Sequence, residues 1–386
     1  MSIFRLALTN LRFRKQNALV SILLMAFGIG LVSLVLTVKD TLENKAGNSA
    51  KGIDLVIGAK GSPLQLVLAN VFHIDNPTGN ISLKQVQPFL RNPLIQQTAL
   101  LSYGDYYKNT RILGTSLSFF QFYPVRIKEG RLPQKAMEVA ISSQTASALQ
   151  LKPGDRFTGN HGDSEGDTHH NSFVVTGILQ LNGTVTDKLI ITPLESVWEV
   201  HHHMPGTDPE VTAALVRFRN PMGMMTIPGI INKKTTLMAA LPAIEINRLL
   251  SLFESAFNAL IYLAFAIVVI ALLSVFLSLI NSLEQRKYEL ALIRLQGGTR
   301  TQVFGLICFE AQLTALAGSV VGLLMSKIAL FLILPILNPA MNADFTNLLP
   351  EEVALIPAAI IIGTIAAIVP AIKACRVNIN ELLSER

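Results

Sequence analysis

The residues of this chain with the most specific chemistry are histidines and carboxylates that lie close together in the sequence. Imidazole nitrogens and carboxylate oxygens bind zinc and copper, so short spacings between them favour metal sites. All seven histidines lie between residues 73 and 203, which confines any such site to one region. Two groups have suitable spacing: His161, Asp163, His169 and His170 form one, and Glu199, His202 and His203 form the other.

The second group is expected at the end of a short helix. Thr192–Glu195 reads Thr-Pro-Leu-Glu, a capping-box pattern with proline at the first helical position, so a helix should begin there. On that helix Glu199 lies one turn from His203 and near His202. A metal site is one interpretation. The other is that the histidines are favoured at the helix C-terminus by its dipole, without any metal.

The first group is expected at a hairpin tip. Phe157 and the alternating run Phe173–Leu179 have the pattern of two strands, which places residues 161–170 between them. Polar tips are commonly just solvated. Calorimetric titration with zinc separates the two interpretations for both groups, because only a metal site gives heat at micromolar zinc.

The composition predicts a membrane protein with a sizeable water-exposed part. The chain has 386 residues, of which 50% are hydrophobic and 15% charged. This is too apolar for an ordinary soluble protein and too polar for a bundle of ten or more spans. Four segments are long and apolar enough to cross a bilayer as helices: Asn17–Val38, Phe257–Ile280, Val303–Ser326 and Val353–Ile372.

Basic residues flank these segments asymmetrically, which sets the orientation. The positive-inside rule places such clusters in the cytoplasm. It therefore predicts a multi-pass membrane protein with cytoplasmic N and C termini and a large domain on the outer side of the membrane. Because the net charge of +6 is explained in this way, we expect lipid and no nucleic acid as a partner. The basic flanks are Arg5, Arg12, Arg14 and Lys15; Arg286, Lys287, Arg294 and Arg300; and Lys373, Arg376 and Arg386.

The third apolar segment and its end carry two charges and two spaced glycines. Glu310 and Lys327 lie about 25 Å apart on a straight helix, so they cannot pair with each other. Lys327 is expected to extend towards the outer surface and Glu310 to lie near the inner end. Gly318 and Gly322 are four residues apart, a spacing that lets another helix approach closely, either in a dimer or within one subunit.

The region between the first two spans predicts a mixed α+β domain. Its helices are expected after the Ser82–Gln85 capping-box pattern, near Leu64–Phe72 and over Gln144–Leu149, while Pro221–Ile231, rich in Gly, Met and Pro, is expected to be a loop. Short alternating or β-branched runs predict strands. These runs are Thr98–Tyr103, Thr110–Gly114, Val139–Ile141, Leu189–Ile191 and Ala213–Arg217.

A charged stretch, Glu284–Gly298, separates the second and third spans. It combines charged side chains with an apolar face, on which Leu292 and Leu295 lie three residues apart, and Gly297–Gly298 would end a helix. Such a segment suits a wet contact with a soluble partner. An ordinary cytoplasmic loop is the alternative.

The sequence lacks the motifs most typical of independent catalysis. It contains no G-x-x-x-x-G-K-[ST] phosphate loop, no H-E-x-x-H and no C-x-x-C. A G-x-S-x-G spacing occurs at residues 162–166, but it lies in the polar stretch expected at a hairpin tip and not between a strand and a helix, as a nucleophile elbow requires. We therefore expect a chain that is not an enzyme and does not hydrolyse ATP by itself.

The succession of motifs resembles the permease subunits of type VII ABC transporters, the group of MacB, FtsX, LolC and LolE. The resemblance runs nearly end to end, with one departure at Ile379, where the family usually has proline. Its motifs are Ala7–Leu11 with a basic cluster, Gly130–Arg131, Ala148–Asp155, Val175–Leu179, Glu284–Gly298, Phe309–Glu310 with Gly318 and Gly322, and Pro370–Arg376.

The resemblance implies a fold and a role. The fold is an α-helical membrane protein with four transmembrane helices and a large MacB-like α+β periplasmic domain between helices 1 and 2. The implied domain boundaries are 1–40 for an interfacial helix and the first span, 41–250 for the periplasmic domain, 251–283, 284–302 for a cytoplasmic coupling helix, 303–337, 338–352 for a short outer loop, and 353–386.

The implied role is a stand-alone permease subunit of the bacterial inner membrane, without a fused ATPase. It would work as a homodimer with a separate ABC ATPase that binds ATP and Mg, and with a periplasmic adaptor or substrate-binding protein. Motion would pass through the coupling helix to the periplasmic domain, for export or extraction of a substrate. The alternatives are an FtsX-like signal transmitter and a component of zinc or copper transport. The implied coupling residues are Glu284, Arg286, Glu289, Leu290, Leu292, Arg294, Gly297 and Gly298.

Overall fold

The computed structural model describes residues 15–160, 168–200, 208–337 and 348–376. The expected interfacial helix over residues 2–16 lies almost wholly outside the described residues. The chain divides into two units. Residues 1–42 and 253–386 form a membrane unit, and residues 43–252 form an outer unit.

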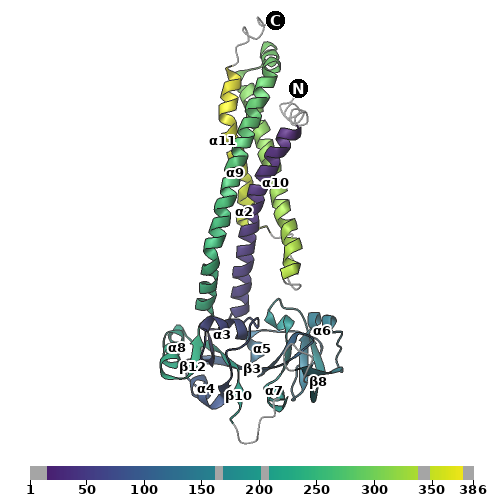
Figure 1. Cartoon of the computed structure of the whole chain (residues 1–386), viewed down its shortest axis with the longest axis vertical. Coiled ribbons are helices and arrows are strands. Elements are labelled where there is room, and N and C mark those ends of the chain that lie inside the picture. The colour runs from purple at the N-terminus through teal and green to yellow at the C-terminus, as the bar shows by residue number, and fades with distance from the viewer. Residues whose placement is uncertain (1–14, 161–167, 201–207, 338–347, 377–386) are drawn as a thin grey trace. The chain divides into compact units, whose positions relative to one another are not determined.

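Four long helices build the membrane unit, and all four are long and apolar enough to cross a membrane. They lie side by side over much of their length (Figure 1). This confirms the four expected spans, although each helix continues beyond the apolar segment that predicted it. The helices are α2 (Lys15–Ala50), α9 (Pro242–Leu295), α10 (Arg300–Leu337) and α11 (Pro350–Cys375).

The stretch expected as a separate coupling helix is not a separate element. Residues 284–295 continue α9 without a break, and α10 begins only five residues later, at Arg300. Nothing in this part of the sequence would interrupt a helix, because Glu284–Leu295 contains no Gly or Pro and is rich in Glu, Leu, Ala and Arg.

A large mixed sheet forms the centre of the outer unit. Its strand order is β12-β1-β11-β3-β4-β9-β6-β8-β5, with β7 paired to β3 and β8, and a small second sheet pairs β10 with β2. The strands are β1 (Leu55–Ala59), β2 (Ile81–Ser82), β3 (Ile95–Tyr107), β4 (Thr110–Thr115), β5 (Ile127–Gly130), β6 (Glu138–Ser142), β7 (Arg156–Asn160), β8 (Thr168–Leu179), β9 (Ile190–Pro193), β10 (Glu210–Val211), β11 (Ala213–Phe218) and β12 (Leu237–Ala240).

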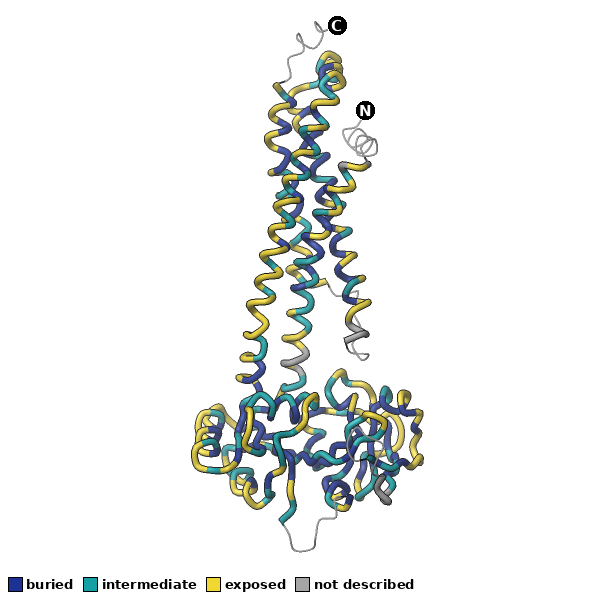
Figure 2. Tube along the Cα trace, viewed as in Figure 1, coloured by how far each residue is buried: buried dark blue, intermediate teal, exposed yellow. Residues whose placement is uncertain are grey.

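Short helices pack against this sheet, and buried apolar residues concentrate where they meet it (Figure 2). The expected strands and most of the expected helices are present, which confirms the α+β class of this unit. The helices are α3 (Pro63–Asn70), α4 (Leu83–Leu90), α5 (Phe119–Phe122), α6 (Ser143–Leu149), the 3₁₀ turn η1 (Val185–Lys188), α7 (Leu194–Val200) and α8 (Pro221–Lys234).

The expected loop over Pro221–Ile231 is wrong, because these residues form the helix α8. The side chain of Asn220 accepts a hydrogen bond from the Met222 amide, and Pro221 occupies the first turn, where its missing N–H does no harm. Ile227 and Ile231, one turn apart, are buried in the core of the outer unit. Burial of this apolar stripe outweighs the low helix propensity of Gly and Pro.

Two expected capping boxes also differ from the structure. Ser82 precedes α4 as predicted, but its hydroxyl donates to the carboxylate of Asp208 instead of capping its own helix. The Asp208 carboxylate also accepts from the Lys84 amide at 3.3 Å. At the second site Pro193 is the last residue of β9, and α7 begins at Leu194. Both differences arise from partners that are distant in the sequence.

Three motifs of the outer unit that carry the family resemblance meet at the strand β8. They are Gly130–Arg131, Ala148–Asp155 and Val175–Leu179. Arg131 donates its amide to the Thr176 carbonyl of β8 at 2.9 Å, and the Gly154 amide donates to the Val175 carbonyl at 2.8 Å. A Cβ at Gly177 would lie 2.2 Å from the Arg131 carbonyl oxygen, so only glycine permits this approach. Residues that look like separate landmarks therefore build one local structure.

Candidate functional site

The turn between α9 and α10 closes one end of the membrane bundle. Gly297 adopts a positive φ of 92°, and its amide donates to the Arg294 carbonyl at 3.2 Å. The Gly298 amide reaches the Ile293 carbonyl at 2.9 Å. This pair of bonds is a Schellman motif, which ends a helix at a left-handed residue. The two glycines thus end α9 as the sequence predicts. We call residues 284–310 around this turn the turn end.

Arg286 fastens α9 to α10 at the turn end. Its Nη1 lies 3.1 Å from Oε1 of Glu310, and its Nε lies 3.0 Å from Oε2 of Glu289. The side chains of Arg286 and Glu310 are only 11% and 7% exposed. Separating an ion pair with such low exposure is unfavourable, because each charge would be left poorly solvated. The pair therefore keeps α9 and α10 together at this point. The sequence predicted only that Glu310 lies near the inner end of its helix, and the structure adds its pairing with Arg286.

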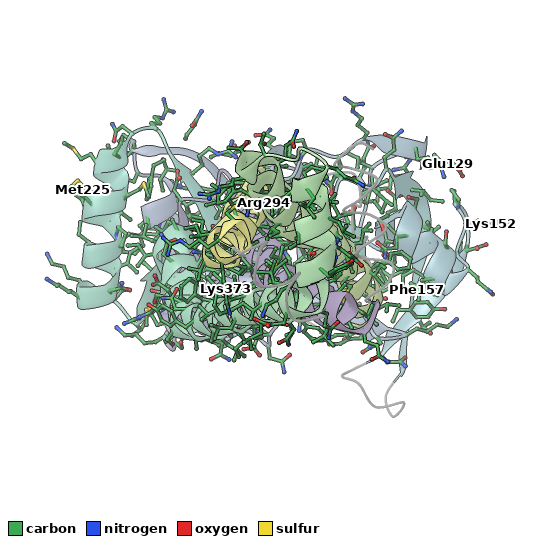
Figure 3. All side chains as sticks on the ribbon, turned by 90° about the horizontal axis from the view of Figure 1, so that it is seen from above. Glu129, Lys152, Phe157, Met225, Arg294 and Lys373 are labelled. Atoms are coloured by element: carbon green, nitrogen blue, oxygen red, sulfur yellow. The ribbon has the colours of Figure 1, made fainter. Side chains whose placement is uncertain are left out.

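A second charged contact joins α9 to α11. Glu284 lies 3.4 Å from Nζ of Lys373 and also pairs with Lys287 on its own helix. These side chains are about half exposed, so this contact is weaker than that of Arg286. Lys373 and Arg294 project from the same end of the bundle (Figure 3).

A small cavity lies beside the Arg286–Glu310 pair. Apolar side chains of α9 and α10 line it together with these two charges, and its volume is about 10 Å³. That is barely the space of one water molecule, so this cavity is too small to hold a transported substrate.

The side chains around the turn differ sharply in exposure. Leu290 is buried in the apolar core between α9, α10 and α11. Leu292 and Leu295 are 40% and 53% exposed, and Glu289 is exposed beside them. The expected shared face of Leu292 and Leu295 therefore points away from the bundle. The turn end combines a buried anchor with an outer surface of leucine and charge.

The opposite end of the bundle contains the most deeply buried charges, and here the expectation for Lys327 is wrong. Lys327 does not extend to the surface: it is 8% exposed, and its Nζ lies 2.8 Å from Oε2 of Glu352. Glu352 belongs to the first turn of α11 instead of an outer loop, and it is fully buried. A buried carboxylate close by stabilises the ammonium more than a long reach to water would.

Four groups donate to the Glu352 carboxylate. Besides Lys327, the hydroxyls of Ser33 and Thr37 donate to Oε1 at 2.5 and 2.8 Å, and the Leu349 amide donates to Oε2 at 3.0 Å. Ser33 also shares a hydrogen bond with Ser326. These residues come from α2, α10 and α11. We call Ser33, Thr37, Ser326, Lys327 and Glu352 the loop-end network.

Gly318 and Gly322 lie between these two ends, facing α2. A Cβ at Gly318 would lie 2.7 Å from Cβ of Met25, and one at Gly322 would lie 2.6 Å from the Ala26 carbonyl oxygen. Of the two alternatives for these glycines, the contact within one subunit is therefore the one formed in this chain.

Most of the candidate metal-binding side chains cannot be compared with the structure. His161, Asp163, His202 and His203 lie outside the described residues. His169 and His170 lie in β8 and Glu199 in α7. Among the described residues no group of three or more suitable side chains is close enough to hold a metal ion. The zinc or copper site stays a prediction.

His73 is the one histidine whose surroundings are fully described. Its Nδ1 lies 2.5 Å from the Tyr103 hydroxyl, which also bonds to the Ala69 carbonyl. Burial, assisted by the charge of Arg111, lowers the pKa of His73 to about 3. It is therefore a neutral core residue at physiological pH.

Comparison with known families decides the identity of the chain. A model of the MacB-like periplasmic core domain matches residues 18–224, more than half of the chain. A model of the FtsX-like permease C-terminal domain matches residues 261–379. The chain is a permease of the type VII ABC transporter family. The match confirms the resemblance drawn from the motifs, and it covers both units of the permease.

Three solved structures similar to the permease each cover about half of its chain. The periplasmic region of MacB from Actinobacillus actinomycetemcomitans has 12% identity and a TM-score of 0.36, covering 52% of the permease and 95% of that chain. The extracellular domain of the transporter YknZ from Gram-positive bacteria has 12% identity and a TM-score of 0.33, covering 48% and 98%.

A third solved structure is a domain of a putative permease protein from Porphyromonas gingivalis, with 15% identity and a TM-score of 0.30, covering 49% of the permease and 89% of that chain. A comparison with curated proteins finds no match. The permease is thus a membrane protein with an extracellular domain, and membership of this family implies an ABC ATPase as its partner.

Proposed function

We propose that the turn end is the surface through which a separate ABC ATPase moves the permease. The observation that carries this proposal is the exposed pair Leu292 and Leu295 on a helix end that is anchored by buried groups. Exposed leucines beside charges suit a contact with a soluble protein, because apolar area supplies affinity and charges supply orientation.

The anchoring explains how a push at this surface would reach the bundle. Leu290 is buried among α10 and α11 side chains, and Arg286 pairs with Glu310 of α10. A displacement of the turn would therefore move α9 and α10 together instead of only bending an exposed loop. The Schellman motif makes the turn itself short and well defined.

In this proposal the permease works as a homodimer in the bacterial inner membrane, with the turn end and both termini in the cytoplasm. ATP and Mg bind to the partner ATPase. ATP-driven movement is passed mechanically to the outer unit, where substrate is exported or extracted on the periplasmic side. The spans contain few polar groups, which favours this mechanism over a hydrophilic path for substrate through the bilayer.

Leu292→Arg tests the proposal. We expect it to abolish most of the stimulation of the copurified ATPase, because a guanidinium replaces an apolar contact at the centre of the surface, while the permease still inserts into the membrane. Glu289→Arg should act in the same direction.

The matched control is Leu252→Arg, the same substitution at another exposed leucine of α9, 40 positions from Leu292 in the sequence. It should leave ATPase stimulation unchanged. Full stimulation by Leu292→Arg would overturn the proposal.

The proteins that copurify with the permease from membranes distinguish its cellular role. A periplasmic adaptor or substrate-binding protein beside the ATPase supports transport. A periplasmic hydrolase instead supports the signal-transmitting alternative, in which the same movement switches a partner and no substrate is carried.

A further inference from the structure

The two ends of the membrane bundle join different sets of helices. At the turn end, the buried apolar cluster takes its members from α9, α10 and α11, and the described residues of α2 contribute none to it. The ion pairs there follow the same division, since Arg286 and Glu284 of α9 reach Glu310 of α10 and Lys373 of α11. The helix that is fastened by charge at this end is α9.

At the other end the fastened helix is α2. Ser33 and Thr37 of α2 donate to Glu352 of α11, and Lys327 of α10 completes the network. The described partners of the Glu352 carboxylate include no residue of α9. Glu352 is fully buried, and an isolated charge in the membrane is unfavourable without such donors.

The pair α10–α11 is common to both ends. The two helices pack tightly along their length, as a Cβ at Gly363 would lie 2.8 Å from Cβ of Ala315 and 3.1 Å from the Ala311 carbonyl oxygen. Gln312 also donates to the Thr364 hydroxyl at 3.1 Å. Close packing of small residues favours a pair that moves as one body.

We propose that Glu352 is a positioning residue that clamps α2 to the α10–α11 pair, so that movement entering at the turn end is delivered to α2. This inference rests on the proposed function and assigns its route through the bundle. The described contacts between α2 and α9 include the hydroxyl pair Ser21 with Ser274 at 3.0 Å, packing of Gly28 against Val268, and the apolar cluster of Met25, Ile29 and Ala271. None of these contacts involves a charged group.

The chain continues from the clamped part of α2 into the outer unit. The same helix, α2, carries Ser33 and Thr37 and runs to Ala50, and β1 follows at Leu55. A displacement delivered to α2 at Ser33 and Thr37 is therefore passed along the backbone to the segment 43–59. This segment is where the effect of the clamp should be measured.

The double variant Ser33→Ala, Thr37→Val removes the α2 side of the clamp and leaves the Lys327–Glu352 ion pair and the Leu349 amide in place. Glu352 keeps its counter-charge Lys327 and the Leu349 amide as donors to Oε2, so the bundle should still assemble, with reduced stability because Oε1 loses its two donors. Thr41→Val is the matched control, because the Thr41 hydroxyl donates to the Thr37 carbonyl of its own helix at 2.7 Å.

The measurement uses the full permease with its copurified ATPase in lipid nanodiscs. Hydrogen exchange of residues 43–59 is compared with and without a non-hydrolysable ATP analogue. We expect the analogue to change this exchange in the wild type and in Thr41→Val, and to lose this effect in the double variant. A change that persists in the double variant overturns the proposal.

A second measurement tests the clamp independently of the ATPase. Spin labels at Leu42 and Val353, both exposed, lie on α2 and α11, in a chain with Cys308→Ala and Cys375→Ala. We expect the distance distribution between them to broaden about twofold in the double variant, because this end of α2 loses its side-chain hydrogen bonds to α11 and keeps only its packing against Gly318 and Gly322 of α10. An unchanged width overturns the clamp.

The two measurements also separate failure of the clamp from failure of the proposed function. Stimulation of the ATPase should be retained in the double variant, because the turn end is untouched. If the wild type itself fails to stimulate the ATPase, the proposed function is wrong, and the distance measurement still decides whether Glu352 holds α2.

Discussion

The turn end and the loop-end network use the same kinds of side chain in opposite ways. At the loop end, Lys327 and Glu352 are 9% and 0% exposed and are surrounded by donors from three helices. At the turn end, Glu289 and Lys373 are 63% and 58% exposed, and only Arg286 and Glu310 are buried. Buried charged side chains hold helices to one another, whereas exposed charged side chains can also contact a partner protein.

The difference follows from what each end can offer to a charge. Groups that stay in contact with water need few protein partners, so the exposed pairs contribute little to stability. A carboxylate that is fully buried needs every donor it has. The loop-end network should therefore dominate the stability of the bundle, and the turn end should dominate its response to the ATPase.

Lys327→Met should break this contrast most strongly. It leaves Glu352 buried without its counter-charge and should lower the free energy of unfolding of the membrane unit by about 3–5 kcal/mol. Thermal unfolding in nanodiscs measures the loss.

The double variant Lys327→Met, Glu352→Leu serves as its control and should recover most of the stability, since no charge remains to be buried. A loss below about 1 kcal/mol for Lys327→Met would mean that Glu352 is solvated after all.

Arg286→Met should have an intermediate effect. We expect a loss of about 1–3 kcal/mol, because Glu310 loses a buried hydrogen-bonded partner while Glu289 remains solvated. Unfolding of the same preparation measures it, and Glu289→Gln is the control, with an expected loss of about 0–1 kcal/mol. If Glu289→Gln lowered the free energy of unfolding as much as Arg286→Met, the distinction between exposed and buried charges at the turn end would be wrong.

The outer unit supplies a smaller effect that sharpens the comparison. Arg131 pairs with Glu138 in water-exposed surroundings and, with the Gln134 and Lys135 amides, lowers the pKa of Glu138 to about 2. Because the folded-state pKa is depressed, this stabilisation is present above the unfolded pKa of about 4.5 and is lost as the pH falls towards 2.

Glu138→Gln should remove this pH-dependent stabilisation by the Arg131–Glu138 pair. We expect the pH at which β6 loses half of its protection from hydrogen exchange to shift by about one pH unit. The buried His73 is neutral in the folded state, and its pKa is lowered from 6.5 to about 3. The fold therefore loses stability as the pH falls from 6.5 to about 3, and this separate loss should remain in the Glu138→Gln variant. An unaltered midpoint in Glu138→Gln would show that the Arg131 pair contributes nothing to the fold.

The local sequence pattern predicted the structure correctly where the contacts of a residue follow from the periodicity of its own helix or strand. The hairpin predicted from Phe157 and Phe173–Leu179 is confirmed, and Phe157 lies directly opposite Phe173 in the register of β7 and β8. The end of α9 at Gly297–Gly298 was equally predictable, because only a left-handed residue forms that cap. The four spans followed from length and composition alone.

The local sequence pattern failed to predict the structure where a residue contacts partners that are distant in the sequence. Glu352 was expected in an outer loop because the apolar segment that predicts the fourth span begins only at Val353. No local pattern around Glu352 indicates that Ser33 and Lys327 are its partners. Likewise α8 forms because Ile227 and Ile231 are buried in the core of the outer unit, and this burial cannot be deduced from Gly- and Pro-rich residues. Tertiary contacts decided both cases.

The position of Glu352 also bears on how the permease is assembled in the membrane. Its donors belong to the first and third of the four long helices, whereas Glu352 itself lies at the start of the last one. The carboxylate leaves water most favourably when Lys327 is already in place as its counter-charge and Ser33 and Thr37 are there as further donors. Insertion of the final helix is therefore favoured on a bundle whose earlier helices are already correctly arranged.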